Sequence, residues 1–118
     1  MQPVRIMPHQ PIVTLDEIDT LRQAKDESYH EFLHVRDMSA GLYVLPAGGV
    51  DPQQPHAEDE LYYVVAGSGQ IAIEGGDYAV ATGSAVFVPA LAEHRFHSIT
   101  EDLRILVVFA PAETHIST

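Results

Sequence analysis

Short alternating runs of hydrophobic and polar residues dominate the chain from about residue 29 onward. Each run is rich in β-branched and aromatic residues and is bounded by Gly, Pro, Asp or Ser, which is typical of β-strands. We expect strands near residues 29–36, 40–46, 59–66, 70–74, 77–81, 85–88, 94–99 and 103–109. Because no helical pattern separates these runs, they predict an all-β sandwich or barrel rather than alternating strands and helices.

The residues before the strands contain one candidate helix, residues 14–25. Thr14 is a possible N-cap, acidic residues follow it in the first turn, and Leu15, Ile18 and Leu21 recur at helical spacing. The length of 118 residues suits a single domain. We therefore expect one domain over residues 1–118, with a short helix or irregular segment in 1–28 and the barrel in 29–111.

Glycine-containing segments and one long apolar run suggest how the strands connect and associate. We interpret Gly67-Ser68-Gly69 and Gly75-Gly76-Asp77 as turns between sequential antiparallel strands, since Gly adopts positive φ without steric cost. After Arg104, the run 103–109 is apolar on both faces. A strand that is covered on both sides accounts for this pattern, and a homodimer interface is one way to cover it.

Composition and charge narrow the classes of function. With 17 acidic and 6 basic residues the formal net charge is −11, which argues against binding to nucleic acid or to anionic membranes. No apolar run is long enough to span a membrane, and the N-terminal residues lack a secretory signal pattern, so a cytoplasmic location is expected. The chain has no cysteine, so any metal ion must bind through nitrogen and oxygen donors.

Polar residues with the chemistry of metal ligands stand where strands begin: Gln54, His56, Glu60 and His94. On one straight strand His56 and Glu60 would lie about 13 Å apart, too far to share an ion. We therefore expect the polar segment Ala57-Glu58-Asp59 to form a turn that brings Glu60 back beside His56.

At these residues the sequence resembles the cupin superfamily, in particular the small single-domain cupins of the cupin-2 type. The first cupin motif matches Gly48, Gln54-Pro55-His56, Glu60 and Gly67, with Gln54 in place of the first histidine. The second motif matches Gly83, Pro89 and His94, and Ser98 stands where an asparagine is common. The resemblance implies an RmlC-like double-stranded β-helix, or jelly-roll β-barrel, with a metal ion inside it.

Carried over by position, the resemblance implies that His56, Glu60 and His94 are metal ligands, with Gln54 as a weaker fourth. Two histidines and one carboxylate suit Fe, Mn, Ni, Co or Zn. Asp51 or Glu58 would replace Glu60 if the turn lies elsewhere. His97 should face away from His94, because residues three apart on a strand point to opposite sides.

Tyr62 and Phe96 each follow an expected ligand by two residues, so they should face the same interior as Glu60 and His94. They are candidates for a substrate pocket or for the core. The resemblance favours a metal-dependent enzyme acting on a small molecule in the barrel, with dioxygenase, isomerase and lyase chemistry all open. Glu58, His30 and Tyr62 are conceivable bases. The alternative is a non-catalytic module that binds or senses a small ligand.

Overall fold

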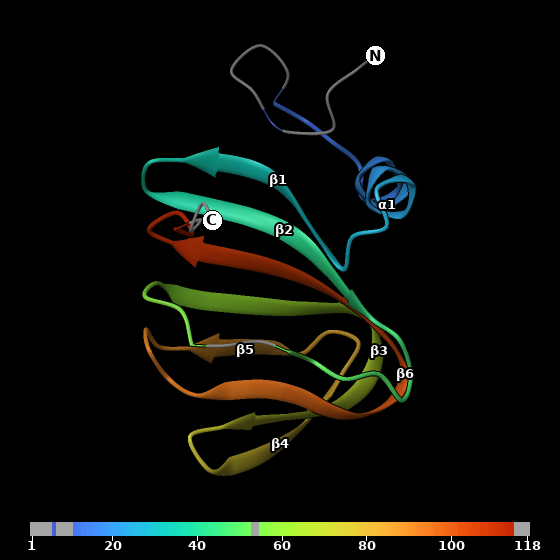
Figure 1. The fold of residues 1–118 in the computed structure, drawn as a ribbon, viewed down its shortest axis with the longest axis vertical. Coiled ribbons are helices and arrows are strands. Elements are labelled where there is room, and N and C mark those ends of the chain that lie inside the picture. The colour runs from blue at the N-terminus through green and yellow to red at the C-terminus, as the bar shows by residue number, and fades with distance from the viewer. Residues whose placement is uncertain (1–5, 7–10, 53–54, 115–118) are drawn as a thin grey trace.

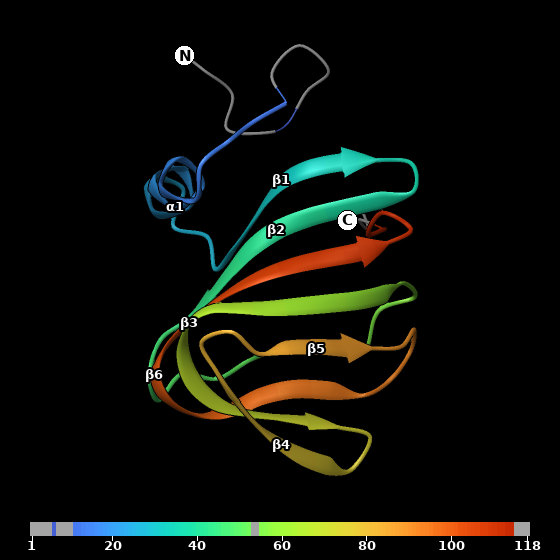
Figure 2. The ribbon, with the colours of Figure 1, turned by 180° about the vertical axis from the view of Figure 1, so that it is seen from behind.

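The computed structural model of the protein describes residue 6 and residues 11–52 and 55–114. Its elements are α1 (Leu15–Ala24), β1 (Tyr29–Val35), β2 (Met38–Leu45), β3 (Asp59–Ile73), β4 (Gly76–Ala81), β5 (Ala85–Val88) and β6 (His94–Ala110). The strands form one antiparallel six-stranded sheet in the order β1-β2-β6-β3-β4, and β5 pairs with β3. The sheet curls around its interior, as both views show (Figures 1 and 2). The predicted all-β fold with a short N-terminal helix is confirmed.

The strands β3 and β6 are longer than the sequence pattern indicated. The runs predicted as 59–66 and 70–74 are parts of β3, and those predicted as 94–99 and 103–109 are parts of β6. The interpretation of Gly67-Ser68-Gly69 as a turn between strands is therefore wrong. Gly67 has a φ of 103° and lies where a Cβ would collide with the backbone of Asp102, and the pairing with β6 shifts register on both sides of it. The glycine lets the paired strands bend without ending β3.

The second predicted turn, Gly75-Gly76-Asp77, is present but lies one residue earlier, since Gly76 and Asp77 already belong to β4. Glu74 and Gly75 connect β3 to β4 with φ values of 46° and 86°, and Ile73 pairs with Gly76 across the turn. Two central residues with positive φ suit the right-handed twist of a tight hairpin.

Two hydrophobic clusters hold the sheet and the helix. The larger one fills the inside of the curl and includes Tyr62, Phe96 and the inward residues Leu103, Ile105, Val107 and Phe109 of β6. The smaller one joins Ile18 of α1 to Phe32, Ala40 and Leu42, and Leu106 and Val108 of β6 pack against it. The chain itself therefore covers part of the outward face of the 103–109 run. The homodimer stays a prediction.

The helix begins as predicted. Thr14 is its N-cap, and Thr14 and Glu17 form a capping box in which each side chain bonds to the other residue's backbone N–H. The part of the chain that the structure describes contains no helix, α1 included, that is long and apolar enough to cross a membrane.

Candidate metal centre

The backbone around His56 turns as the sequence predicted. Residues 57 and 58 form a bend, and β3 begins directly after it at Asp59. The segment is fastened to the loop before β6, because Leu91 N–H donates to the His56 carbonyl over 2.7 Å and Ala90 N–H donates to Asp59 Oδ1 over 2.8 Å. These bonds bring His56, at the start of the turn, close to the beginning of β6.

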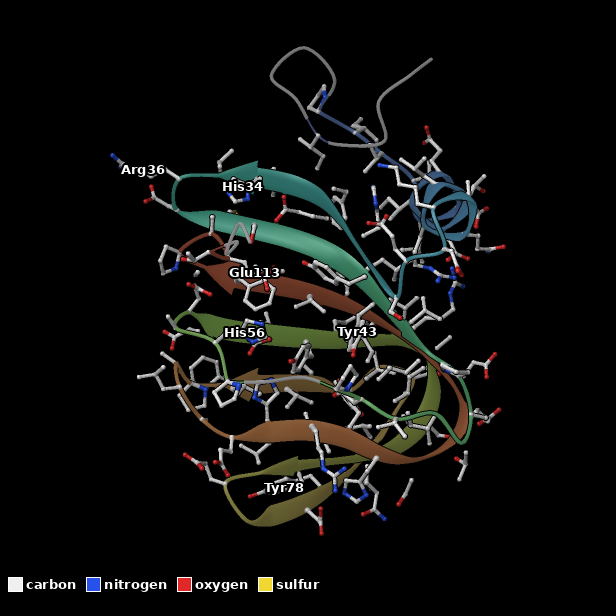
Figure 3. The ribbon with its side chains drawn as sticks, in the orientation of Figure 1. His34, Arg36, Tyr43, His56, Tyr78 and Glu113 are labelled. Carbon is white, nitrogen blue, oxygen red and sulfur yellow. The ribbon has the colours of Figure 1, made fainter. Side chains whose placement is uncertain are left out.

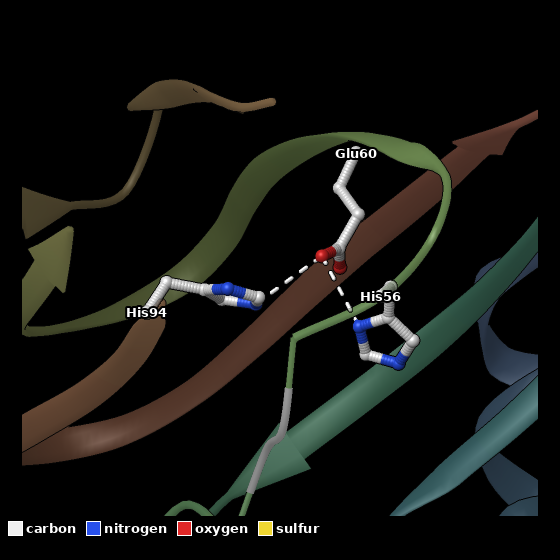
Figure 4. A group of neighbouring side chains, drawn as sticks. All are labelled: His56, Glu60 and His94. Atoms are coloured by element: carbon white, nitrogen blue, oxygen red, sulfur yellow. Dashed lines mark ion pairs between the residues drawn. The ribbon is translucent and has the colours of Figure 1, made fainter. Parts of the chain in front are cut away.

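The side chains of His56, Glu60 and His94 converge on one point (Figure 4). One ligand atom from each lies within 4.8 Å of the others. Oε2 of Glu60 is 3.2 Å from Nδ1 of His56 and 3.2 Å from Nε2 of His94. Glu60 and His94 are buried, with 2% and 6% of their surface exposed, and His56 is half-buried. The three residues that the motifs indicated therefore form a group that could hold a metal ion.

Neighbouring groups fix the orientation of Glu60 and His94. The Tyr62 hydroxyl donates to Oε1 of Glu60 over 2.7 Å, leaving Oε2 directed at the two imidazoles. The carbonyl of Ala92 lies 2.9 Å from Nδ1 of His94. Because a carbonyl can only accept, Nδ1 carries the proton, and the lone pair of the neutral ring resides on Nε2, the nitrogen nearer Glu60.

A carboxylate from the segment after β6 reaches the other side of His56. Oε2 of Glu113 lies 3.1 Å from Nε2 of His56 (Figure 3). The backbone N–H of Glu113 donates to Ser39 Oγ over 2.8 Å, and the Thr114 hydroxyl donates to Glu58 Oε2 over 3.0 Å, so this segment is anchored on both sides. Nothing in the motifs pointed to Glu113, which follows Pro111 outside any strand.

The carboxylates strongly favour the protonated imidazoles. The Glu113 and Glu60 carboxylates raise the pKa of His56 to about 10, against a smaller opposing effect of burial. Burial would raise the pKa of Glu60, but the favourable interactions with the His56, His94 and Tyr62 side chains outweigh it and lower that pKa to about 2. Burial lowers the pKa of His94 and the Glu60 carboxylate raises it, and the pKa of His94 is raised overall.

The donor set and one unpaired atom fit a divalent cation. Two imidazoles and a carboxylate are nitrogen and oxygen donors that suit first-row divalent metals. Nδ1 of His56 is buried and has no hydrogen-bond partner among the described residues, although it is 3.2 Å from Oε2 of Glu60. A cation between these groups would complete the bonding of that nitrogen.

The structure separates the other predicted ligands from this group. Asp51 is buried, but its carboxylate accepts from the Tyr43 hydroxyl over 2.6 Å and from Phe96 N–H over 2.9 Å. Glu58 bonds to Thr114, as described above. His97 faces away from His94, as predicted, and its Nε2 lies 2.7 Å from Oδ1 of Asp77. Gln54 lies outside the described residues, so its role as fourth ligand stays a prediction.

A cavity of about 190 Å³ adjoins His56, and its lining differs from the predicted pocket. The lining residues are Tyr29, Tyr43, Pro52, His56, Val107, Phe109 and Glu113. Tyr62 and Phe96 are instead packed in the core, with 0% and 1% exposure and ring centroids 5.1 Å apart. Tyr29 and Tyr43 are paired across β1 and β2 and both point inward. Strand alternation in the sequence is consistent with this, but the pairing can be recognised only once the register of β1 and β2 is known.

The proposed bases are likewise placed away from the cavity or already bonded. His30 is buried on the same outer side of β1 as Phe32, and its Nδ1 lies 3.0 Å from Glu27 Oε1. Tyr62 bonds to Glu60, and Glu58 bonds to Thr114. Of the described acidic residues, Glu113 is the one that lines this cavity.

A family model described as a cupin domain matches residues 41–109. An uncharacterized protein of Streptomyces coelicolor, SCO3923, is 52% identical over 100 residues, covering 85% of this chain and 95% of that protein.

Solved structures show the same fold at low sequence identity. An RmlC-like cupin family protein with a double-stranded β-helix fold from Methanocaldococcus jannaschii has a TM-score of 0.65 at 20% identity, over 70% of this chain and 78% of that chain. KdgF from a Halomonas species has a TM-score of 0.64 at 24% identity, over 70% of this chain and 76% of that chain. The curled sheet described above therefore has the fold of these proteins, the double-stranded β-helix of the Methanocaldococcus jannaschii cupin.

Proposed function

This chain belongs to the cupin domain family, and from that premise we propose that it is a metal-dependent enzyme acting on a small molecule inside the barrel. The observation that carries the proposal is the convergence of His56, Glu60 and His94 within 4.8 Å of one another. These three residues would hold a divalent ion of Fe, Mn, Ni, Co or Zn.

A bound ion would supply Lewis acidity, and a redox-active ion would also supply one-electron chemistry. The residues of the chain would do the rest. Tyr62 holds Glu60 in place, and the Ala92 carbonyl holds the ring of His94. The cavity beside His56 would take the substrate, and its largely apolar wall would limit the water around it. Oxygenase, isomerase and lyase reactions are all compatible with these parts.

Elemental analysis tests the proposal most directly. We expect protein purified without chelator to contain close to one divalent ion per chain, and Glu60→Gln to lose it because the amide is a weaker donor than the carboxylate. Activity screens with the identified ion would follow. A folded wild-type protein that takes up none of the five metals would end the proposal.

A second candidate is a non-catalytic module that binds or senses a small ligand. The positions of the three candidate bases favour it. Tyr62 and Glu58 are already hydrogen-bonded to other side chains, and His30 lies outside the cavity. Stoichiometric ligand binding without turnover, in protein loaded with its metal, would support the module over the enzyme.

We also propose that the protein forms a homodimer. Leu61, Tyr63 and Phe87 have exposures of 48%, 47% and 59%, and they lie on the paired strands β3 and β5. Neighbouring exposed apolar side chains on a sheet are a common feature of protein interfaces. Analytical ultracentrifugation that finds only monomer at tens of micromolar would contradict this proposal.

A further inference from the structure

The hydroxyl of Tyr29 is a buried donor with no hydrogen-bond partner among the residues that the structure describes. Its ring comes from β1 and packs edge-on against Tyr43 and Phe109, with centroid distances of 6.2 and 6.5 Å. All three rings line the cavity beside His56. A buried hydroxyl without a partner is costly, so an acceptor atom that reached it from the cavity would gain a hydrogen bond from Tyr29.

The other tyrosine of the cavity is not available for this purpose. The hydroxyl of Tyr43 donates to Oδ1 of Asp51 over 2.6 Å. A tyrosine hydroxyl has one proton to donate, and that of Tyr43 is already used in the bond to Asp51. The hydroxyl proton of Tyr29 remains available for a hydrogen bond to a bound molecule.

A glycine in the neighbouring strand makes room for the Tyr29 ring. Gly41 lies in the middle of β2, and a Cβ placed there would collide with the end of the Tyr29 ring, including its hydroxyl. Gly41 has no positive φ that would otherwise require glycine. The absence of a side chain at Gly41 therefore leaves the space that the phenol end of Tyr29 occupies.

The remaining lining residues and the volume of the cavity indicate the size and polarity of the ligand. Pro52, Val107 and Phe109 add apolar wall to the two tyrosine rings. The volume of about 190 Å³ is somewhat larger than that of a cavity of roughly 150 Å³ that binds benzene in another protein. A single ring with one or two small substituents fits this space.

The carboxylates near Tyr29 disfavour an anion beside its hydroxyl, although the cavity wall also holds His56, whose pKa is raised. Glu113 stands in the wall, and burial together with the carboxylates of Glu113, Glu31 and Glu60 raises the pKa of the Tyr29 phenol. The same carboxylates would repel a negatively charged group placed beside that hydroxyl.

We infer that the cavity binds a neutral, ring-sized organic molecule whose carbonyl or hydroxyl oxygen accepts a hydrogen bond from Tyr29. This inference rests on the proposed function for the presence of a small molecule in the barrel, but not on the metal ion.

Two probes of the same shape test the hydrogen bond. Acetophenone has a carbonyl oxygen where α-methylstyrene has a methylene group, so the pair differs mainly in the acceptor. We expect NMR titrations of the purified protein, before and after treatment with EDTA, to show acetophenone binding roughly three- to tenfold more tightly. Tyr29→Phe should remove that preference while leaving the affinity for α-methylstyrene.

Tyr78→Phe is the matched control, because it removes the same hydroxyl from an exposed side chain of β4 (Figure 3). It should preserve the preference. Equal affinity of the wild-type protein for the two neutral probes, or no binding of either, would overturn the inference. Benzoate that binds the EDTA-treated protein as tightly as acetophenone would overturn the requirement for a neutral ligand.

Metal content measured on the same preparations separates this inference from the proposed function. A protein that binds acetophenone through Tyr29 but takes up no metal would retain the inference and lose the metal-dependent enzyme. A protein that binds one metal ion per chain but neither neutral probe would lose the inference alone.

Discussion

Glu113 and His56 are joined by an ion pair in which Oε2 of the carboxylate lies 3.1 Å from Nε2 of the imidazole. A carboxylate can only accept a hydrogen bond, so this contact keeps a proton on Nε2. Nδ1 also faces a carboxylate, that of Glu60, but a metal ion bound to Glu60 would take the place of the Nδ1 proton, so Nδ1 is the nitrogen left to donate a lone pair. A residue outside both sequence motifs thus determines which nitrogen of His56 has a lone pair to offer a metal ion.

Glu113→Ala should weaken metal binding without preventing it. Loss of a carboxylate that orients a histidine ligand typically costs ten- to hundredfold in affinity, and we expect a loss of that order for Zn²⁺. Competition with a chromophoric chelator measures it.

The matched control for this change is Glu31→Ala. Glu31 also pairs with a histidine, since its Oε2 lies 3.2 Å from Nδ1 of His34, but that pair is outside the metal group. Equal Zn²⁺ affinity in the wild-type protein and Glu113→Ala would show that Glu113 does not act on His56 as described.

Metal affinity should rise with pH through the neutral range. The pKa of His56 is raised to about 10 and that of His94 is also raised, so below those values an incoming ion must displace protons. Glu60, with a pKa lowered to about 2, is already ionised and adds nothing to the dependence. Each displaced proton changes the apparent affinity by about tenfold per pH unit.

Chelator competition at about pH 6, 7 and 8 would measure this slope. His34→Ala should leave the slope unchanged, because His34 lies on β1 outside the metal group. An affinity that is flat over this range would mean that the ligands are neutral before the ion arrives.

The ligand group could be predicted because its residue types and intervals match the two cupin motifs. The bend between His56 and Glu60 followed from a distance argument, and the opposite directions of His94 and His97 followed from strand alternation. The continuity of β3 and β6 could not be predicted in the same way. Gly67 satisfies the usual sequence rule for a turn, and only the pairing with β6 on both sides of it reveals a bend within one strand.

The cavity was harder to predict than the ligands. Alternation indicates that Tyr62 and Phe96 point inward, but it does not tell which inward side chains are packed and which border a space. That distinction depends on the curl of the sheet, which brings Tyr29 of β1 and Phe109 of β6 together. No sequence pattern indicated that Glu113 would reach the metal centre, since its position depends on contacts with Ser39 and His56.

Gly41→Ala should destabilise the protein because the new methyl group collides with the buried end of the Tyr29 ring. Overpacking of this kind typically costs about 1–3 kcal/mol, which chemical denaturation would detect. Gly76→Ala is the matched control, since its Cβ would also meet a tyrosine, Tyr78, but that side chain is 56% exposed and can move away. A Gly41→Ala cost that persists in a Tyr29→Ala background would contradict this explanation.

His94 and His97 provide the sharpest test of the metal centre, because they lie on the same strand and face opposite sides of it. His94→Ala removes a buried ring whose Nε2 is 3.2 Å from Glu60, so bound metal should fall from about one ion per chain to nearly none. His97→Ala removes a ring that contacts Asp77 and should leave the metal content unchanged.

Both substitutions delete an imidazole from β6, and neither ring belongs to the hydrophobic core cluster, so the fold should survive each change. Far-UV circular dichroism would check this, and elemental analysis of the same samples would count the bound ions. The two variants differ in which side of β6 loses its donor, and a general effect of losing a histidine would therefore appear in both. Metal lost from His97→Ala but retained in His94→Ala would refute the assignment of His94 as a ligand, whatever the fold of the protein.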